Sequence, residues 1–147
     1  MKPIAACVVD ASVGIKLFVN EPLSDVALSF FVSAADTPNV RRYVPDLFFV
    51  ECANVLWKYV SRYGLRPQAA ARYLADLHAL RLAVIPTSAL TQSALKIAMD
   101  LSISVYGAFY VATAELLNVP LITADKRLAR RLADTKHHVL YLEELVI

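Results

Sequence analysis

The chain is organised around a run near its N-terminus, Ile4-Ala5-Ala6-Cys7-Val8-Val9-Asp10-Ala11-Ser12. A short apolar run that ends on polar residues is typical of a buried strand in a parallel sheet. Asp10 closes the run at the carboxyl end of the strand, where open α/β sheets bind their ligands. Two interpretations of Asp10 are open from this stretch alone. It is either a ligand of a divalent metal ion or the N-cap of the following helix, a role that Asp and Ser fill routinely.

Strand and helix patterns alternate along the rest of the chain and are joined by short connections. Strands are predicted at 4–9, 42–44, 83–85, 121–123 and 139–141. Helices are predicted at 11–19, 23–35, 47–63, 68–80, 90–101, 108–117 and 126–133, with a break at 102–106 and a short tail element at 142–147. This alternation predicts a three-layer α/β/α sandwich with a mainly parallel central sheet, formed by one domain over residues 1–147.

The composition is apolar: 58% of the residues are hydrophobic, 19% are charged and the mean hydropathy is +0.50. This fits a sheet covered on both faces, with part of the apolar surface buried against a partner chain. No stretch reaches the roughly 18 uncharged apolar residues that a membrane span needs. The N-terminal run is too short and too poorly flanked for a signal peptide, so we expect a cytoplasmic protein with no membrane partner.

Cysteine and histidine do not suggest a metal site or a disulfide framework. Cys7 and Cys52 both lie in apolar segments and are interpreted as core residues. The three histidines, His78, His137 and His138, have no metal-ligand spacing, so a zinc site is not expected.

The net charge of +2 does not by itself argue for nucleic acid. Basic residues nevertheless gather in two places: Arg41 and Arg42, and then Lys126, Arg127, Arg130 and Arg131. These side chains would suit RNA phosphates, although a solvated helix face is the commoner explanation of such runs. Four aromatic residues, Trp57, Tyr59, Tyr63 and Tyr73, fall on the predicted helices 47–63 and 68–80. Packing or a partner interface is their first interpretation, and base stacking is the second.

Three carboxylates occur in similar surroundings. Asp10 ends the first strand, Asp125 follows the strand 121–123, and Glu51 lies in an apolar run where a charge is costly unless it is paired or bound to a metal. Because a right-handed parallel fold brings the ends of its central strands to one edge, we expect the three to cluster there. Mg²⁺ or Mn²⁺ suits such oxygen ligands and would activate water for attack on a phosphodiester. Glu51 taken alone could instead pair with an arginine, and Asp46 is better explained as the N-cap of helix 47–63.

Four motifs carry a family resemblance. In chain order they are Val9-Asp10-Ala11-Ser12, Pro45-Asp46-Leu47-Phe48-Phe49-Val50-Glu51-Cys52-Ala53-Asn54-Val55-Leu56, Tyr106-Gly107-Ala108-Phe109-Tyr110-Val111-Ala112-Thr113-Ala114-Glu115 and Leu121-Ile122-Thr123-Ala124-Asp125-Lys126-Arg127-Leu128. With these motifs in this order, the chain resembles PIN domains over essentially its whole length. It is most similar to the VapC toxins of bacterial and archaeal toxin–antitoxin pairs.

The resemblance implies a metal-dependent endoribonuclease that is usually a homodimer and is held inactive by a cognate antitoxin. It assigns metal binding and catalysis to three carboxylates, Asp10, Glu51 and Asp125. Ser12 and Thr123 match hydroxyl positions that support these carboxylates. Asn54 lies one helical turn beyond Glu51 and shares its face of the predicted helix.

The chain departs from the family pattern at Gly107, where the resembling proteins carry a further acid at the head of the late helix. Glycine cannot ligate through a side chain, so three acids remain, enough for one Mg²⁺ that keeps several waters but less suited to two metals. Asp100 is a weak surrogate for the missing acid, and Glu115 lies roughly 12 Å of helix rise away, too far to replace it. Three explanations of Gly107 are open. The glycine is natural and the protein has altered activity, or the glycine marks an inactive protein, or it is an engineered substitution that inactivates the enzyme.

Three functions are therefore compared. The first is a VapC-type ribonuclease, and the second is a catalytically inactive PIN-fold protein that binds RNA or an antitoxin, which Gly107 favours. The third and weakest is a phosphatase with Asp10 as the nucleophile. Haloacid-dehalogenase-like phosphatases need a second Asp two residues after the first, and Ser12 occupies that place.

Overall fold

Five parallel strands form one sheet in the order β3-β2-β1-β4-β5. The structure is a computed structural model that describes residues 1–146, so the last residue of the predicted tail element and of the predicted domain lies outside the described residues. The strands are β1 (Ala6–Val9), β2 (Arg41–Pro45), β3 (Leu82–Ile85), β4 (Leu121–Thr123) and β5 (Val139–Tyr141). Within residues 1–146 every strand pairing is parallel, where the sequence predicted a mainly parallel sheet.

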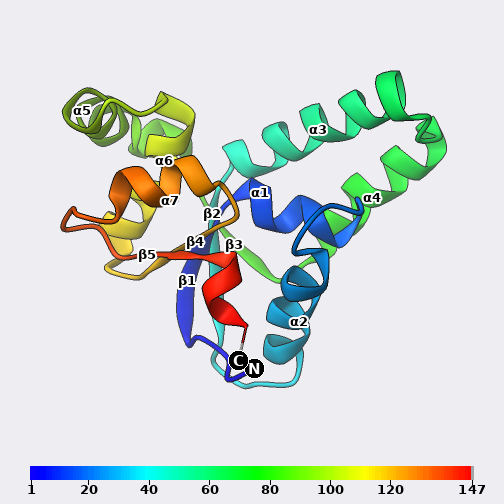
Figure 1. Cartoon of the computed structure of the whole chain (residues 1–147), viewed down its shortest axis with the longest axis horizontal. Coiled ribbons are helices and arrows are strands. Elements are labelled where there is room, and N and C mark those ends of the chain that lie inside the picture. Colours follow the sequence, from blue (N-terminus) through cyan, green and yellow to red (C-terminus); the bar gives the residue numbers. More distant parts are fainter. Residues whose placement is uncertain (147) are drawn as a thin grey trace.

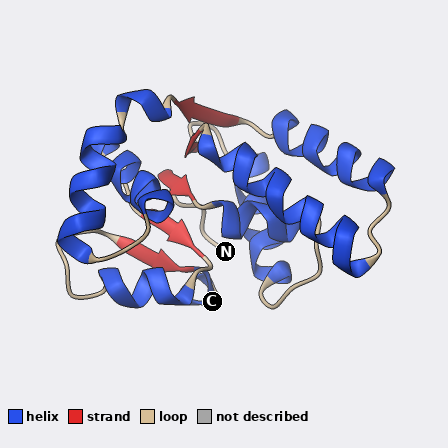
Figure 2. Cartoon of the chain, turned by 90° about the horizontal axis from the view of Figure 1, so that it is seen from above, coloured by secondary structure: helices blue, strands red, loops and turns tan. Residues whose placement is uncertain are grey.

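Within residues 1–146, seven α-helices and two short 3₁₀ segments connect the strands, and a third 3₁₀ segment follows β5. The helices are α1 (Ala11–Gly14), α2 (Ser24–Ala35), α3 (Leu47–Tyr63), α4 (Pro67–Ala79), α5 (Thr91–Leu101), α6 (Val105–Leu117) and α7 (Lys126–Leu132). The 3₁₀ segments are η1 (Ile15–Leu17), η2 (Thr87–Ala89) and η3 (Leu142–Leu145). Figures 1 and 2 show α1 to α4 on one side of the sheet and α5 to α7 on the other, which confirms the predicted α/β/α sandwich.

Strand β1 lies at the centre of the sheet, and its position explains its apolar sequence. Cys7, Val8 and Val9 are fully buried, because the sheet is covered on both faces. Val9 pairs with Ile122 of β4, and the Asp10 N–H donates to the Ile122 carbonyl at 3.0 Å. The chain runs outward from β1 through β2 to β3 and then returns to β4 on the other side of β1. The ends of β1 and β4 therefore form the point where the strand order reverses, the usual ligand site of such sheets.

Helix α6 begins three residues earlier than the predicted helix 108–117. Ser104 is its N-cap, and the Ser104 hydroxyl accepts a hydrogen bond from the Gly107 N–H at 3.0 Å. Serine is a preferred N-cap because its oxygen satisfies an N–H group of the first turn. Residues Ala108 to Ala114 are buried against the sheet. The earlier start places Gly107 inside the first turn of the helix rather than just before it.

Helices α3 and α4 form a hairpin that projects from the sheet (Figure 1). Gly64 ends α3 with a φ of 71°, a left-handed conformation that glycine adopts without steric cost. Asp46 stands at the N-cap position of α3, but its side chain makes no capping hydrogen bond. The Asp46 carboxylate instead accepts from the Thr87 N–H at 3.0 Å, and so ties the end of β2 to η2. Asp46 therefore occupies the predicted N-cap position of α3, but the predicted capping hydrogen bond is absent from the described residues.

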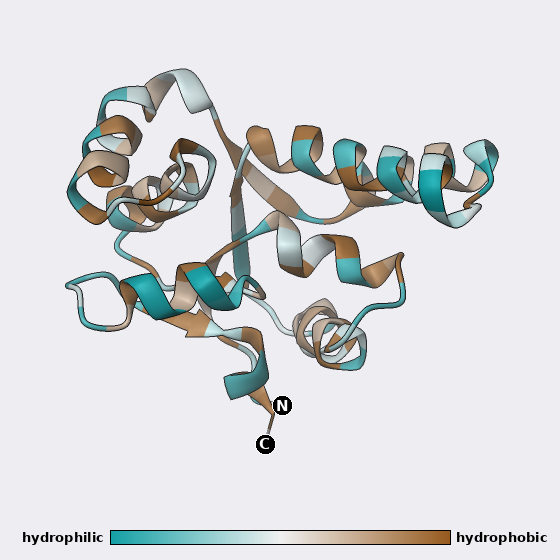
Figure 3. Ribbon diagram, turned by 45° about the horizontal axis from the view of Figure 1, so that its top comes forward, coloured by the Kyte–Doolittle hydropathy of each residue, from teal (hydrophilic) through white to brown (hydrophobic). Residues whose placement is uncertain are grey.

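The surface is uneven in hydropathy, as Figure 3 shows. Most of α7 is hydrophilic, and the far end of the α3–α4 hairpin is also largely hydrophilic. Within residues 1–146 no single helix has both the length and the apolar character to cross a membrane, although the bent pair α5 and α6, at 114°, meets those two criteria when taken together.

Candidate functional site

The Asp10 carboxylate is buried at the end of β1 and is held by two hydroxyl groups. Its Oδ2 accepts hydrogen bonds from the Ser12 hydroxyl at 2.9 Å and from the Thr123 hydroxyl at 2.6 Å. Its Oδ1 accepts from the Ser12 N–H at 3.4 Å, so Asp10 also caps α1, though with a long hydrogen bond. The capping and the site interpretations of Asp10 are therefore compatible, and both hydroxyls that the resemblance singled out contact this carboxylate.

The hydroxyls of Ser12 and Thr123 also hold the backbone that follows β4, where the second carboxylate, Asp125, lies. The Ala124 N–H donates to the Ser12 hydroxyl oxygen at 3.0 Å, and the Asp125 N–H donates to the Thr123 hydroxyl oxygen at 3.0 Å. Each hydroxyl thus donates to Asp10 and accepts from the backbone that follows β4. The ends of the two central strands are held together by side chains as well as by the sheet.

Asp125 is exposed and caps helix α7. Its Oδ1 accepts from the backbone N–H groups of Arg127 at 3.0 Å and Leu128 at 3.1 Å. Its Oδ2 accepts no hydrogen bond from the described residues and is available to a ligand.

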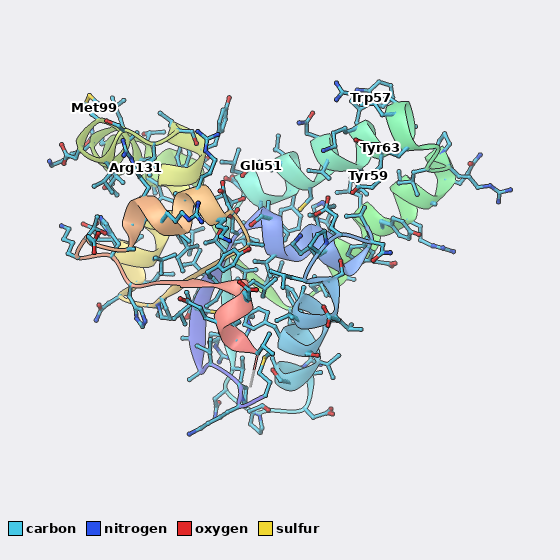
Figure 4. All side chains as sticks on the ribbon, viewed as in Figure 1. Glu51, Trp57, Tyr59, Tyr63, Met99 and Arg131 are labelled. Atoms are coloured by element: carbon cyan, nitrogen blue, oxygen red, sulfur yellow. The ribbon has the colours of Figure 1, made fainter. Side chains whose placement is uncertain are left out.

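Glu51 reaches the site from α3 and is held by Tyr110 of α6, a residue to which the sequence analysis gave no role. The Tyr110 hydroxyl donates to Glu51 Oε1 at 2.7 Å, and the tyrosine is buried. A tyrosine inside the most apolar helix needs a partner for its hydroxyl, and Glu51 was the carboxylate expected in an apolar run. Those two signals together could have identified the pair. Figure 4 shows Glu51 at the root of α3, between the two helical layers.

The three carboxylates interact electrostatically. Burial raises the pKa of Asp10, hydrogen bonds from Thr123 and Ser12 oppose the rise, and the charge of Asp125 adds to it. Burial also raises the pKa of Glu51, the Tyr110 hydrogen bond opposes this, and the charge of Asp10 adds to it. A bound cation would favour the charged forms of Asp10 and Glu51, and so would offset the rise that burial and neighbouring negative charge cause in the pKa of each.

A cavity of about 550 Å³ joins these side chains. Five of the residues proposed from the sequence line it: Asp10, Ser12, Glu51, Asn54 and Asp125. Tyr106 and Val50 are also in its wall. Thr123 is fully buried behind the cavity, and its hydroxyl contacts Asp10, Ser12 and Asp125 of the wall. The structure therefore brings the predicted carboxylates to one hollow at the carboxyl end of the sheet.

The donor set suits a hard divalent cation in its chemistry, since carboxylate oxygens are the ligands that Mg²⁺ and Mn²⁺ prefer. The geometry is open: within residues 1–146, no three His, Cys, Asp or Glu side chains lie close enough to hold one metal ion together. Gly107 stands in the first turn of α6, where the resemblance expects another acid. A Cβ there would lie 3.3 Å from the Ser104 hydroxyl oxygen and 3.5 Å from a Leu128 methyl, so an acid would fit after a shift of a few tenths of an ångström.

A second cavity, of about 750 Å³, adjoins the first and shares Asp125 with it. Its wall includes three arginines of α7, Arg127, Arg130 and Arg131, and also Gly107. Three of the arginines expected to suit RNA phosphates therefore lie beside the carboxylate cavity. Lys126 is exposed at the start of α7 but is not in the wall of this cavity.

The other predicted RNA contacts, Arg41 and Arg42, lie at the start of β2, the opposite end of the sheet. Arg42 is 5% exposed, donates from Nη1 to the Ile4 carbonyl at 2.7 Å and stacks 4.3 Å from the Phe30 ring centre. It cannot reach a phosphate, which corrects the prediction for this residue. Successive side chains of a strand point to opposite faces of the sheet. Because both faces are covered here, the sequence of β2 does not show which of its side chains are buried.

Neither candidate surrogate for the missing acid reaches the site. Asp100 pairs with Lys96 at 2.7 Å on the exposed side of α5. Glu115 lies 3.7 Å from the His137 ring and 4.0 Å from the Lys136 ammonium, at the other end of α6.

Comparisons with known proteins agree with this geometry. A family model described as PIN domain matches residues 7–133. Ribonuclease VapC3 from Pyrobaculum aerophilum is 33% identical over 126 residues, which make up 84% of this chain and 92% of that protein.

Two solved structures show the likeness of fold. The crystal structure of PAE2754 from Pyrobaculum aerophilum superposes with a TM-score of 0.67 at 24% identity, covering 99% of this chain and 90% of that one. A chain of a toxin–antitoxin complex from Klebsiella pneumoniae superposes with a TM-score of 0.65 at 18% identity, covering 92% of this chain and 97% of that one.

Proposed function

The chain belongs to the PIN domain family, and on that premise we propose that it is a metal-dependent endoribonuclease of the VapC toxin type. The observation that carries the proposal is the shared cavity of Asp10, Glu51 and Asp125, with hydroxyls that orient the first of these carboxylates. The name of the relative that is 33% identical, Ribonuclease VapC3, supports RNA as the substrate class.

In this proposal Asp10, Glu51 and Asp125 would hold one Mg²⁺ or Mn²⁺ after their side chains move closer together than they lie in the structure. The ion would activate a water molecule and stabilise the charge that develops on a phosphodiester. Ser12 and Thr123 keep the Asp10 carboxylate in one orientation, and so preserve the order of the site before the ion binds. Tyr110 does the same for Glu51.

Other side chains of this protein act on the RNA itself. Asn54 lines the cavity one turn beyond Glu51, and in the proposal its amide hydrogen-bonds to the substrate. The guanidinium groups of Arg127 and Arg130 neutralise backbone phosphates beside Asp125.

We also propose a homodimer and a cognate antitoxin as partners. Large apolar side chains are exposed in the wall of the carboxylate cavity, at Val50 and Tyr106, and farther away, at Trp57 of α3 and Met99 of α5. They support a protein partner. The toxin–antitoxin complex among the structural neighbours supports an antitoxin.

The direct test measures cleavage of single-stranded RNA by the purified chain with Mn²⁺. We expect the wild type to cleave and Asp10→Asn to lose on the order of 100-fold in rate, because the buried carboxylate can no longer take a negative charge. Asp46→Asn is the matched control, since Asp46 also follows a strand but lies outside the cavity. Absence of cleavage of any RNA under excess metal, or full activity of Asp10→Asn, would contradict the proposal.

A second function, a PIN-fold protein that binds RNA or an antitoxin without cleaving, is favoured by Gly107 and by the open arrangement of the carboxylates. Gly107→Asp separates the two functions. If the substitution creates both Mn²⁺ binding, measured by calorimetry, and RNA cleavage, the wild type is an impaired nuclease. If it changes neither, the site has another use.

A further inference from the structure

The α3–α4 hairpin carries positive charge to which the proposed function gives no role. Residues 52–75 contain no acidic residue and four basic ones, Lys58, Arg62, Arg66 and Arg72, all of them exposed. Within residues 1–146 none of the four forms an ion pair, although Asp76 stands one helical turn beyond Arg72. Lys58 lies close enough to Glu21 to help lower the pKa of that carboxyl, so the argument rests on the three arginines.

The three arginines stand where the chain turns from α3 into α4. Arg62 is in the last turn of α3, and Arg66 immediately precedes the first residue of α4. A hollow of about 480 Å³ at this turn is lined by Arg66, Gln68, Ala69 and Arg72. Figure 1 shows that the hairpin projects from the sheet, and Figure 3 shows that its far end is largely hydrophilic. We call the surface formed by Arg62 and the four lining residues the hairpin end.

A row of exposed polar side chains leads from the carboxylate cavity to the hairpin end. Asn54 is in the wall of the cavity, and Lys58 and Arg62 follow it at intervals of four residues. Residues four apart are neighbours on one face of a helix, so these side chains form a continuous ridge along α3. Arg62 is roughly 17 Å beyond Glu51 along the helix axis. A strand that leaves the carboxylate cavity along this ridge reaches the hairpin end after about five stacked nucleotides.

The chemistry of the hairpin end suits a nucleic acid better than a protein. Protein–protein interfaces have an apolar centre, whereas protein–nucleic acid interfaces are more polar and much more positively charged. The wall of the hollow offers two guanidinium groups, an amide and a methyl group, with no carboxylate and no large apolar side chain. Guanidinium groups bind the oxygens of a phosphate through paired hydrogen bonds.

We propose that the hairpin end is a second RNA-binding surface, separate from the carboxylate cavity, which binds the strand about five nucleotides away from the cleavage position. The identity of the ligand as RNA rests on the proposed function. An RNA that spans both places is held at two points, so its second contact forms at a high effective concentration. The hairpin end therefore selects strands, or unpaired segments of folded RNA, that are longer than about five nucleotides.

The first experiment measures the affinity of the full chain for a fluorescently labelled single-stranded RNA by anisotropy, in EDTA and at several salt concentrations. The RNA is about 20 nucleotides long, enough to span both places. We expect Arg62→Gln/Arg66→Gln/Arg72→Gln to weaken binding by about tenfold or more and to lower the log–log salt slope by about two, because three phosphate contacts are lost. No RNA binding by the wild type overturns the proposal.

The matched control removes the same charge from the opposite end of the sheet. Lys2, Arg41 and Lys136 are exposed there, before or at the start of strands. We expect Lys2→Gln/Arg41→Gln/Lys136→Gln to change the affinity by less than about twofold. Equal effects of the two triple substitutions would show that only total charge matters, and would overturn the proposal. Thermal melts establish that both variants are folded.

The second experiment tests the dependence on length. Unlabelled RNAs of about 4 and about 12 nucleotides compete with the labelled strand, the shorter one being unable to reach from the carboxylate cavity to the hairpin end. We expect the wild type to gain about tenfold or more in affinity from the shorter to the longer RNA, and the variant without the three hairpin arginines to gain less than about threefold. Equal gains in the two proteins overturn the proposal, because the statistical advantage of a longer strand is the same for both.

A protein ligand is the other occupant to be tested. Oligoglutamate of the same number of charges as the longer RNA is the probe. If it binds more tightly than the RNA and depends on the same three arginines, the hairpin end belongs to a protein partner and the proposal is overturned.

The two proposals fail separately, since these assays involve neither metal nor cleavage. A chain that passes them but never cleaves RNA contradicts the nuclease and supports the hairpin end as an RNA-binding surface. A chain that cleaves RNA but binds it equally well without the three arginines supports the nuclease and overturns the role of the hairpin end.

Discussion

The Thr123 hydroxyl holds two of the three carboxylate segments at once. It donates to Asp10 Oδ2 at 2.6 Å and accepts from the Asp125 N–H at 3.0 Å. Thr123→Val keeps the shape of the side chain but removes both hydrogen bonds. We expect a loss of about 10- to 100-fold in metal-dependent cleavage or in Mn²⁺ affinity, as for other residues that orient metal ligands.

Thr113→Val is the matched control for this prediction. Thr113 is equally buried, but its hydroxyl donates at 2.7 Å to the Phe109 carbonyl of its own helix. Both variants should lose about 1 kcal/mol of unfolding free energy in urea titrations. If Thr113→Val lowers activity as much as Thr123→Val does, the effect is one of stability and the orienting role is wrong.

Individual residues of the site were predictable to different degrees. Asp10, Glu51 and Asp125 were found because a charge ending or interrupting an apolar run is costly and therefore conspicuous. Tyr110 was not found, since a tyrosine in an apolar helix is ordinarily a packing residue, and only the fold brings its hydroxyl to Glu51. Arg42 was wrongly expected to contact RNA, because a sequence does not show that Phe30 and the Ile4 carbonyl will enclose its guanidinium group.

Among the elements, α1 and α3 pack closely because Gly14 has no side chain. A Cβ at Gly14 would lie 2.4 Å from the tip of the Phe48 ring, which is fully buried. We expect Gly14→Ala to lower the unfolding free energy by about 1 to 3 kcal/mol, the usual cost of overpacking a core, despite the better helix propensity of alanine.

Phe48→Leu tests whether the contact between these two helices is the cause. Leucine is shorter than the phenylalanine ring that the new methyl group would meet in the Gly14→Ala variant. The loss of unfolding free energy caused by Phe48→Leu, measured by chemical denaturation, should therefore be smaller in the Gly14→Ala background than in the wild type. Additive effects of the two substitutions would show that the close approach of α1 and α3 is not what Gly14 provides.

A polar contact links the segment after η1 to α3 and makes stability depend on pH. Burial alone would raise the pKa of Glu21, but hydrogen bonds from the Tyr59 hydroxyl at 2.8 Å and the Lys16 ammonium at 3.1 Å lower it below 4.5. A carboxyl with a lower pKa in the folded state contributes stability above its unfolded pKa and loses it as the pH falls through the folded pKa.

We therefore expect Glu21→Gln to be less stable than the wild type at pH 7, with the difference shrinking between about pH 5 and pH 3. Urea titrations at a series of pH values measure this difference. Tyr59→Phe should show the same trend more weakly, because the Lys16 contact remains. A difference that is constant across the pH range would contradict the assignment to Glu21.

The elements themselves were largely predictable, and the failures have local causes. Strands at 121–123 and 139–141 and the helix at 47–63 appear with the predicted bounds, because proline, glycine and charge mark their ends. The start of α6 was missed, since Tyr106-Gly107 is a poor helix sequence that forms only with the Ser104 cap. The positions of β2 and β4 on either side of β1 follow from the right-handed connections between parallel strands, more than from any local sequence pattern.

At the scale of the whole molecule, Trp57 reports on the proposed dimer. It is the sole tryptophan and is 65% exposed. Figure 4 shows it on α3. If a second copy covers this side of the molecule, the Trp57 emission should shift to shorter wavelength and become less accessible to acrylamide as the protein concentration rises. The matched measurement is the molar mass from sedimentation over the same concentrations.

Met99→Glu is the variant that tests the same surface. Met99 is exposed on α5 and a charge there costs the monomer little, but it would oppose burial against a second copy. We expect the variant to remain a monomer with concentration-independent Trp57 emission. A dimer that withstands the substitution would place the interface elsewhere.

The position of β1 between β2 and β4 also has a consequence in time. During translation Asp10 leaves the ribosome among the first residues, whereas Thr123 is the last residue of the fourth of the five strands and Asp125 follows it. A nascent chain that has not yet released β4 lacks the hydroxyl that orients Asp10 and the carboxylate beside it. The order of synthesis thus keeps the carboxylates apart during most of the chain's growth on the ribosome.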